Sequence, residues 1–360
     1  MASTSIDTLE AEYRTLLEGC GLLDRSERGK LALSGAGALE FLNGQVTNEL
    51  IALQSGEGCY AAFLTPKGKM LGDLRILAVG ADDTQTAPSE LLLDTERVAL
   101  QALFDMIRRY KIGYQVELHK RTLERGLLSL IGPTATTVAG AQEPGIDLDE
   151  REHASAALEI DGIACLAVRT YLGVDLICDA SDTHTLAEAL QARGAAPVSE
   201  QAAECLRIEH GRPRYGIDLD DSVIPQEAGL NDRAVSFTKG CYVGQETVAR
   251  LFYKGKPNRH LRGLRLSRPA VSGEQLLLGD RPVGSIASTV VSPRLGPIAL
   301  ALVRREAEPG AVVSVGEDAT SGEIVELPFP LSRAELRLRP RARPEGALRA
   351  GACEPPRPEP

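Results

Sequence analysis

The sequence contains cysteines but none of the spacings that build disulfide frameworks or metal centres. Its seven cysteines, odd in number, show no Cys-x-x-Cys pair and no cluster with histidine; they stand at positions 20, 59, 165, 178, 205, 241 and 353. A zinc site and a four-thiolate iron–sulfur cluster held by neighbouring ligands are therefore excluded. Scattered free thiols are typical of a reducing compartment, so we expect a cytoplasmic protein that binds no metal of its own.

Several other signals are absent as well. No run of about 18 apolar residues is present to cross a membrane, and Met1 to Ser5 lack the basic and apolar character of a signal sequence. Neither Gly-x-Ser-x-Gly nor a metal or triad spacing of the five histidines occurs. The net charge of −10 argues against non-specific nucleic-acid binding, which requires many cations against phosphate. We expect neither membrane nor nucleic acid as a partner.

Hydrophobic periodicity predicts an α+β fold rather than a doubly wound parallel sheet. A hairpin is expected at 59–65 and 69–79 around Pro66-Lys67-Gly68, and a second one around Asp161-Gly162. The other expected elements are helices at 6–17, 36–43, 96–109, 185–193 and 200–209, the last capped by Ser199, and strands at 29–33 and 112–118. Gly35 to Glu40 lacks the third glycine of a dinucleotide loop.

The pattern of expected elements changes near Lys256-Pro257-Asn258. Short strands then recur about every ten residues, which predicts a small all-β barrel; they are expected at 261–266, 275–278, 281–286, 298–303, 311–315 and 323–327. We therefore divide the chain into residues 1–257, with a second subdomain at roughly 52–118, a C-terminal β-barrel at 258–330, and a tail at 331–360 that its Arg, Pro and Glu content predicts to be disordered.

The segment from Ser236 to Arg250 concentrates reactive side chains beyond what packing requires. Cys241 stands between Gly240 and Gly244, just before a predicted short helix. The helix N-terminus and the Lys239 ammonium would both favour the thiolate form of Cys241. The alternative is an ordinary buried cysteine that acts as a small hydrophobe.

Asp73 is a carboxylate inside an apolar strand, between Leu71 and Leu74. Burial of a carboxylate is costly unless the group finds a partner or faces a cavity. The two interpretations left open are a position in a binding pocket and, by simple strand alternation, a position that faces solvent.

Lys239-Gly240-Cys241-Tyr242-Val243-Gly244-Gln245-Glu246 resembles the signature of the YgfZ family. These are folate-binding proteins related to the glycine-cleavage T-protein, an aminomethyltransferase, and they assist iron–sulfur cluster maturation. Segments at 42–48, 67–75, 206–213 and 224–230 are also similar to the wider superfamily, so the resemblance covers most of residues 20 to 330.

The resemblance implies two interleaved antiparallel-sheet subdomains around a central pocket for tetrahydrofolate. It places Asp73, Arg207 and Glu227 beside the pterin and benzoate parts, Lys239 and Arg250 at the glutamate tail, and Cys241 at the pocket rim as a reactive thiol. The remaining cofactor-binding candidates are Tyr242 and Gln245. Val174 stands where the transferase branch has a glutamate, which weakens a transferase interpretation.

Three functions remain. The first is an accessory protein that binds tetrahydrofolate and serves iron–sulfur client or assembly proteins through Cys241. The second is a folate-dependent aminomethyltransferase-like enzyme, which uses Asp73 and needs no thiol. The third is a binding module whose barrel and acidic surface only scaffold partners.

Overall fold

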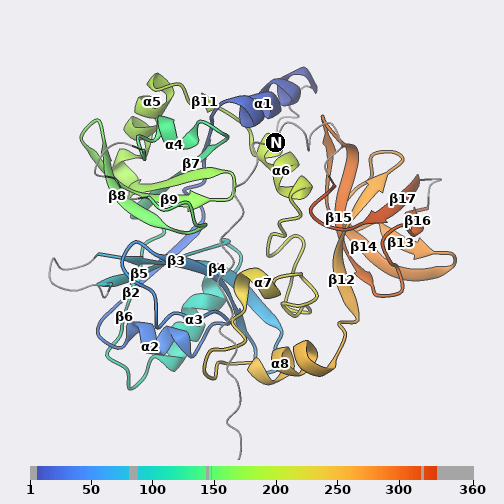
Figure 1. Cartoon of the computed structure of the whole chain (residues 1–360), viewed down its shortest axis with the longest axis horizontal. Helices are drawn as coiled ribbons and strands as arrows, with labels where there is room; N and C mark the ends of the chain where they lie inside the picture. The colour runs from blue at the N-terminus through green and yellow to red at the C-terminus, as the bar shows by residue number, and fades with distance from the viewer. Residues whose placement is uncertain (1–5, 81–87, 143–145, 147, 318–319, 331–360) are drawn as a thin grey trace, which may run out of the picture.

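The computed structural model describes residues 6–80, 88–142, 146, 148–317 and 320–330. Two sheets, antiparallel except at one short edge strand, and a closed barrel carry these residues, with helices packed around them (Figure 1). This is the α+β architecture with a C-terminal barrel that the sequence predicted. The tail predicted to be disordered, 331–360, lies outside the described residues.

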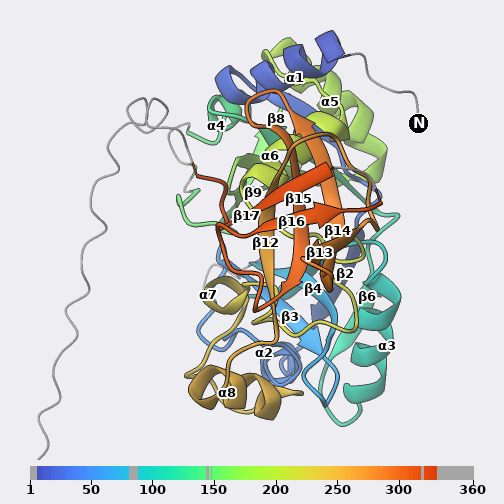
Figure 2. The same cartoon turned by 90° about the vertical axis from the view of Figure 1, so that its right-hand side faces the viewer.

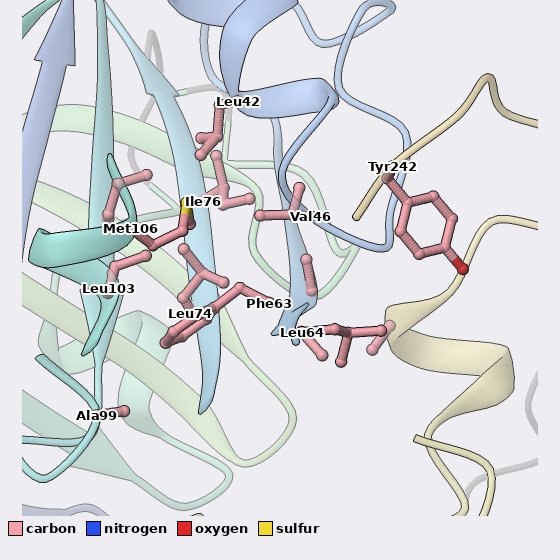
Figure 3. Packing of buried hydrophobic residues seen from close by; sticks show 14 of the residues in the cluster. Leu42, Val46, Phe63, Leu64, Leu74, Ile76, Ala99, Leu103, Met106 and Tyr242 are labelled. Atoms are coloured by element: carbon pink, nitrogen blue, oxygen red, sulfur yellow. The ribbon is translucent and has the colours of Figure 1, made fainter. Parts of the chain in front are cut away.

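The lower sheet in Figure 1 has five strands in the order β3-β4-β5-β2-β6. They are β2 (Gly29–Ser34), β3 (Gly58–Leu64), β4 (Met70–Val79), β5 (Glu90–Thr95) and β6 (Glu117–Lys120). Helices α2 (Ala38–Asn43) and α3 (Leu100–Tyr110) bury their apolar faces against this sheet. Figure 3 shows Leu42, Leu103 and Met106 of these helices packed with residues of β3 and β4 in the largest core.

The upper sheet has six strands in the order β11-β1-β7-β10-β9-β8. They are β1 (Gly21–Asp24), β7 (Arg125–Ile131), β8 (Ser155–Ile160), β9 (Ile163–Thr170), β10 (Gly173–Asp179) and β11 (Ala196–Pro197). Helices α4 (Ala135–Val138) and α5 (Thr183–Ala192) pack against it, with the 3-10 turn η1 (Ala180–Asp182) before α5. Because β1 precedes the whole five-stranded sheet and the other strands follow it, the two subdomains are interleaved. The five-stranded sheet begins at Gly29, well before residue 52.

The barrel closes in the strand order β12-β15-β14-β13-β16-β17. Its strands are β12 (Arg259–Leu266), β13 (Gln275–Leu278), β14 (Arg281–Ser292), β15 (Gly296–Arg304), β16 (Val312–Val315) and β17 (Thr320–Val325). Helix α6 (Glu200–Glu209) lies between the upper sheet and the barrel (Figure 1), where Ile208 packs on Leu261 and Ile298. Figure 2 shows the barrel in front of the sheets, with α7 (Asn231–Ala234) and α8 (Gln245–Lys254) at one end and α1 (Ile6–Glu18) at the other.

Two local predictions are confirmed in detail. Asp161 and Gly162 have φ of 51° and 85°, the left-handed pair that a two-residue hairpin turn requires between β8 and β9. The side chain of Ser199 accepts a hydrogen bond from the Ala202 amide at 3.3 Å and so caps α6.

Three central strands, β5, β7 and β10, were not predicted. Each is buried along nearly its whole length, and a strand covered on both faces shows no alternation of apolar and polar residues. The strand expected at 112–118 lies at Glu117–Lys120 instead, because Ile112 and Gly113 form an exposed turn after α3. In the part of the chain that the structure describes, no helix is long and apolar enough to cross a membrane.

Candidate functional site

A pocket opens where the two sheets, α6 and the segment after it converge. Groups from both sheets line it, including Tyr60, Asp73 and Arg75 from the lower one and Asp175 from the upper one. About 1010 Å³ of this space holds no protein atom, part of it continuous with solvent. The other charged and aromatic lining residues are Arg25, Arg28, Glu96, Glu152, His153, Tyr171, Arg207, Arg212, Arg214, Tyr215 and Arg233.

Asp73 is the carboxylate with the most altered acidity in this pocket. It is 6% exposed, and strand alternation on β4 places it on the face opposite Leu74, which packs in the core. Burial raises the pKa of Asp73 to about 6, while the Tyr60 hydroxyl, which donates a hydrogen bond to Asp73 Oδ2 at 2.6 Å, lowers it. Asp73 therefore changes its protonation state close to neutral pH, as a proton-transfer group requires.

A buried network of ion pairs forms the floor of the pocket. Arg75 donates to Asp94 Oδ2 and to Asp175 Oδ2, both at 2.6 Å, and Arg28 also contacts Asp94 at 2.8 Å. The two arginines hold the pKa of Asp94 well below its usual range. Because Arg75 belongs to β4 and Asp175 to β10, this network joins the two sheets beneath Asp73.

The position of Asp175 also bears on the valine at position 174. Its side chain is fully buried in the core of the upper sheet, whereas the neighbouring Asp175 faces the pocket. The valine at 174 therefore leaves a carboxylate in the pocket at the next position.

Arg207 lines the pocket, but its guanidinium is fully engaged elsewhere. It pairs with Glu204 and with Asp218, both at 2.7 Å, and donates to the Arg212 carbonyl and the Ser288 hydroxyl, both at 2.6 Å. These contacts tie α6 to the following loop and to the barrel. Arg207 thus shapes one wall of the pocket, and its donors are already used within the protein.

Lys239, Tyr242 and Glu227 lie outside the pocket lining and make structural contacts. Lys239 Nζ donates to the carbonyls of Asn43, Val46 and Asn48 at 2.7, 2.8 and 2.6 Å, and burial lowers its pKa to about 8. Tyr242 is 7% exposed and packs in the largest core, where burial raises its pKa to about 12 (Figure 3). Glu227 pairs with Arg259 of the barrel at 2.9 Å.

The other site candidates of the Cys241 segment also lie outside the pocket lining. Cys241 and Arg250 are exposed, and Gln245 is the first residue of α8. Gly244 precedes the helix with φ of 85°, and a Cβ there would lie 2.6 Å from the Thr65 carbonyl in the β3–β4 turn. Only glycine therefore fits this contact.

Sequence reasoning found Asp73 and Arg207 but missed most of the pocket. Tyr60 and Arg75 could have been found by projecting the alternation of β3 and β4, since both lie on the same face of the sheet as Asp73. Asp175 could not, because β10 is buried on both faces and shows no alternation. Glu152, His153 and Arg212 lie in irregular segments, and Arg233 lies in the four-residue helix α7, so no periodicity indicates the direction of these side chains. Among the described residues, no group of three or more His, Cys, Asp or Glu side chains could hold a metal.

Comparison with protein families gives two matches that together span the fold. The GCVT N-terminal domain matches residues 2–239, and the glycine cleavage T-protein C-terminal barrel domain matches residues 259–329.

Individual relatives agree. The chain is 30% identical over 337 residues to an aminomethyltransferase of Chlorobium chlorochromatii, covering 89% of each chain. It is 29% identical over 306 residues to an aminomethyltransferase of Deinococcus deserti, which covers 82% of this chain and 80% of the relative. The crystal structure of aminomethyltransferase T from Bartonella henselae shares the fold, with a TM-score of 0.78 at 24% identity over 89% of both chains.

Proposed function

Because the chain belongs to the glycine cleavage T-protein family, we propose that it binds a reduced folate in the central pocket and catalyses aminomethyltransferase-type one-carbon transfer there. The observation that carries this proposal is Asp73, a buried carboxylate in the lining of the pocket whose pKa burial raises to about 6. This is the second of the three functions that the sequence left open.

The pocket fits the chemical character of tetrahydrofolate. Tyr60 and His153 present nearly parallel rings, 6.2 Å apart, for contact with a flat heterocycle. The Asp73 carboxylate can accept hydrogen bonds from ring N–H groups, and the partly exposed Arg212 and Arg233 of the lining suit the carboxylates of a glutamate tail. Together, these features support a reduced folate as the ligand.

Asp73 has two roles in this proposal. When bound, tetrahydrofolate supplies the nitrogen atoms that receive the one-carbon unit. Asp73 accepts a hydrogen bond from such a nitrogen and takes its proton, because a base with a pKa near 6 is ionised at neutral pH yet still basic. Tyr60 keeps the carboxylate oriented through its 2.6 Å hydrogen bond. The ion pairs of Arg75 below hold β4 in place.

A second candidate is the iron–sulfur accessory role. The observation that favours it is Cys241, the one exposed thiol among the cysteines that the structure describes, between two glycines at the surface. Because the Cys241 segment lies outside the pocket lining, folate binding and a thiol function would occupy separate regions of the molecule. The two functions can therefore be tested separately.

The decisive experiment compares wild type with Asp73→Asn. We expect tetrahydrofolate to raise the melting temperature of both proteins, with a stabilisation of about 2.7 kcal/mol at 100 times the dissociation constant. Transfer of a one-carbon unit from an aminomethylated donor protein to tetrahydrofolate should fall at least about 100-fold in Asp73→Asn, the usual loss when a general base is removed. Cys241→Ser serves as the matched control and should retain full transfer.

Two results would contradict the proposal. Absence of any melting shift at millimolar tetrahydrofolate would leave the scaffold function in its place. Folate binding without transfer, together with failure of Cys241→Ser to restore iron–sulfur enzyme activities in cells lacking the protein, would favour the accessory role.

A further inference from the structure

Two arginines from separate segments meet on one carboxylate at the side of the central pocket. Arg212, in the loop after α6, contacts Glu152 through both of its Nη atoms, at 3.2 and 3.1 Å. Arg233, in α7, reaches the same carboxylate at 3.4 Å. All three side chains line the pocket and are between 22% and 31% exposed, so a ligand can reach them.

Each arginine is also held by an aromatic ring. The guanidinium of Arg212 lies 4.4 Å from the ring centre of Tyr171, and that of Arg233 lies 4.9 Å from the ring centre of Tyr60. Stacking of this kind fixes a planar guanidinium independently of its anion. The two cations would therefore keep their positions if Glu152 moved away, which leaves a preformed fork for another carboxylate.

The segment that carries Glu152 is under local strain. The next residue, His153, has φ of 74°, a left-handed conformation that is unfavourable for any residue other than glycine. Its side chain is 8% exposed, and its Nδ1 atom has no hydrogen-bond partner among the residues that the structure describes. Both the strained backbone and the buried polar atom without a partner raise the free energy of this conformation. If the segment rearranged, relief of this strain would offset part of the free energy lost when Glu152 leaves the arginines.

We propose that Arg212 and Arg233 form a carboxylate-binding subsite of the central pocket, and that Glu152 occupies it until a carboxylate of the ligand displaces it. This inference rests on the proposed function, because it assigns a part of the same pocket. The ligand carboxylate has two conceivable sources, the glutamate portion of a folate and the carboxylate of a small amino acid that enters as amine donor. Both present the same group to the arginine fork.

The test replaces the internal competitor by a neutral isostere, Glu152→Gln. Binding is measured by calorimetry with four probes: tetrahydrofolate, 6-methyltetrahydropterin, p-aminobenzoylglutamate and glycine. Glu150→Gln is the matched control, because it removes the same charge from an exposed position two residues away. A double variant, Glu152→Gln with Arg233→Gln, tests whether the gain depends on the fork. Melting curves verify that each variant is folded.

We expect Glu152→Gln to bind tetrahydrofolate about tenfold more tightly than wild type. This gain corresponds to a subsite that is free of Glu152 in about one wild-type molecule in ten and in every molecule of the variant. Affinity for 6-methyltetrahydropterin, which has no carboxylate, should not change, and Glu150→Gln should match wild type throughout. A gain with p-aminobenzoylglutamate identifies the folate tail as the source, and a gain with glycine identifies the amine donor. The double variant should lose the gain.

Unchanged or weaker binding of every carboxylate probe to Glu152→Gln would overturn the inference and make Glu152 a fixed structural partner of the two arginines. The proposed function fails in a different way. In that case neither tetrahydrofolate nor 6-methyltetrahydropterin binds wild type, while p-aminobenzoylglutamate and glycine still report on the fork. If no probe binds any variant, both proposals are wrong.

Discussion

The central pocket and the Cys241 segment differ in how their polar groups are used. In the pocket, Asp73 is buried and burial raises its pKa to about 6; among the described residues, Tyr60 alone is hydrogen-bonded to its carboxylate. In the segment, the buried ammonium of Lys239 is saturated by three backbone carbonyls. A polar group with an unusual pKa and free bonding capacity is available for chemistry, whereas a saturated group holds the fold.

The same contrast separates the exposed from the buried thiols. Burial raises the pKa of Cys59, Cys165 and Cys205 to about 12, so these thiols are unreactive at neutral pH. Cys241 is exposed. The segment therefore holds side chains of two kinds. Lys239 and Tyr242 make contacts inside the protein, whereas the thiol of Cys241 is accessible to solvent.

The largest effect on stability is expected for Lys239. Replacement by Met removes the donor to three carbonyls and should lower the free energy of unfolding by about 2–4 kcal/mol, as for other buried charged hydrogen bonds. Chemical denaturation measures this change. Lys67→Met, at an exposed position in the β3–β4 turn, is the control. If Lys239→Met melts like wild type but no longer binds tetrahydrofolate, Lys239 is a ligand-binding residue and the division between the two regions is wrong.

A smaller and opposite effect is expected for Asp73→Asn. The folded-state pKa of about 6 lies above the ordinary value of 3.8, so the folded protein binds the proton more tightly than the unfolded chain does. Ionised Asp73 therefore destabilises the fold, and wild type loses stability as the pH rises from about 4 to about 6. At pH 8 the Asn variant should be more stable by about 1–3 kcal/mol, although it is inactive.

Urea denaturation of both proteins between pH 4 and pH 8 checks this prediction. The difference should vanish near pH 4, where Asp73 is protonated in the folded protein. An Asn variant that is less stable than wild type at pH 8 would mean that the ionised carboxylate has a stabilising partner in the pocket.

The pocket and the Cys241 segment also show which features of the structure the sequence alone could predict. The hairpin around Pro66-Lys67-Gly68, the cap at Ser199 and the barrel strands are local patterns, and the structure confirms them. Asp73 stood out because a carboxylate inside an apolar strand needs a reason. By contrast, the partners of Lys239 lie almost 200 residues away in sequence, and Arg75 meets Asp175 only through the packing of two sheets. Such contacts depend on tertiary structure, which no local pattern encodes.

The smallest effect is expected for Cys241→Ser. Because the side chain is exposed, the free energy of unfolding should stay within about 1 kcal/mol of the parent. In a Cys353→Ala background, brief alkylation at pH 7 followed by peptide mapping should label Cys241 before any of the other five cysteines. Earlier labelling of a buried cysteine would show that the surface around Cys241 is closed in solution.

The most direct test of the division between the two regions is a crystal structure of the protein with tetrahydrofolate bound. The account predicts the pterin ring between the two sheets, with a ring nitrogen within hydrogen-bonding distance, about 2.6–3.2 Å, of the Asp73 carboxylate. It also predicts that Lys239 keeps its three carbonyl partners. A folate bound against Cys241, Gln245 and Arg250, with Asp73 left untouched, would contradict it.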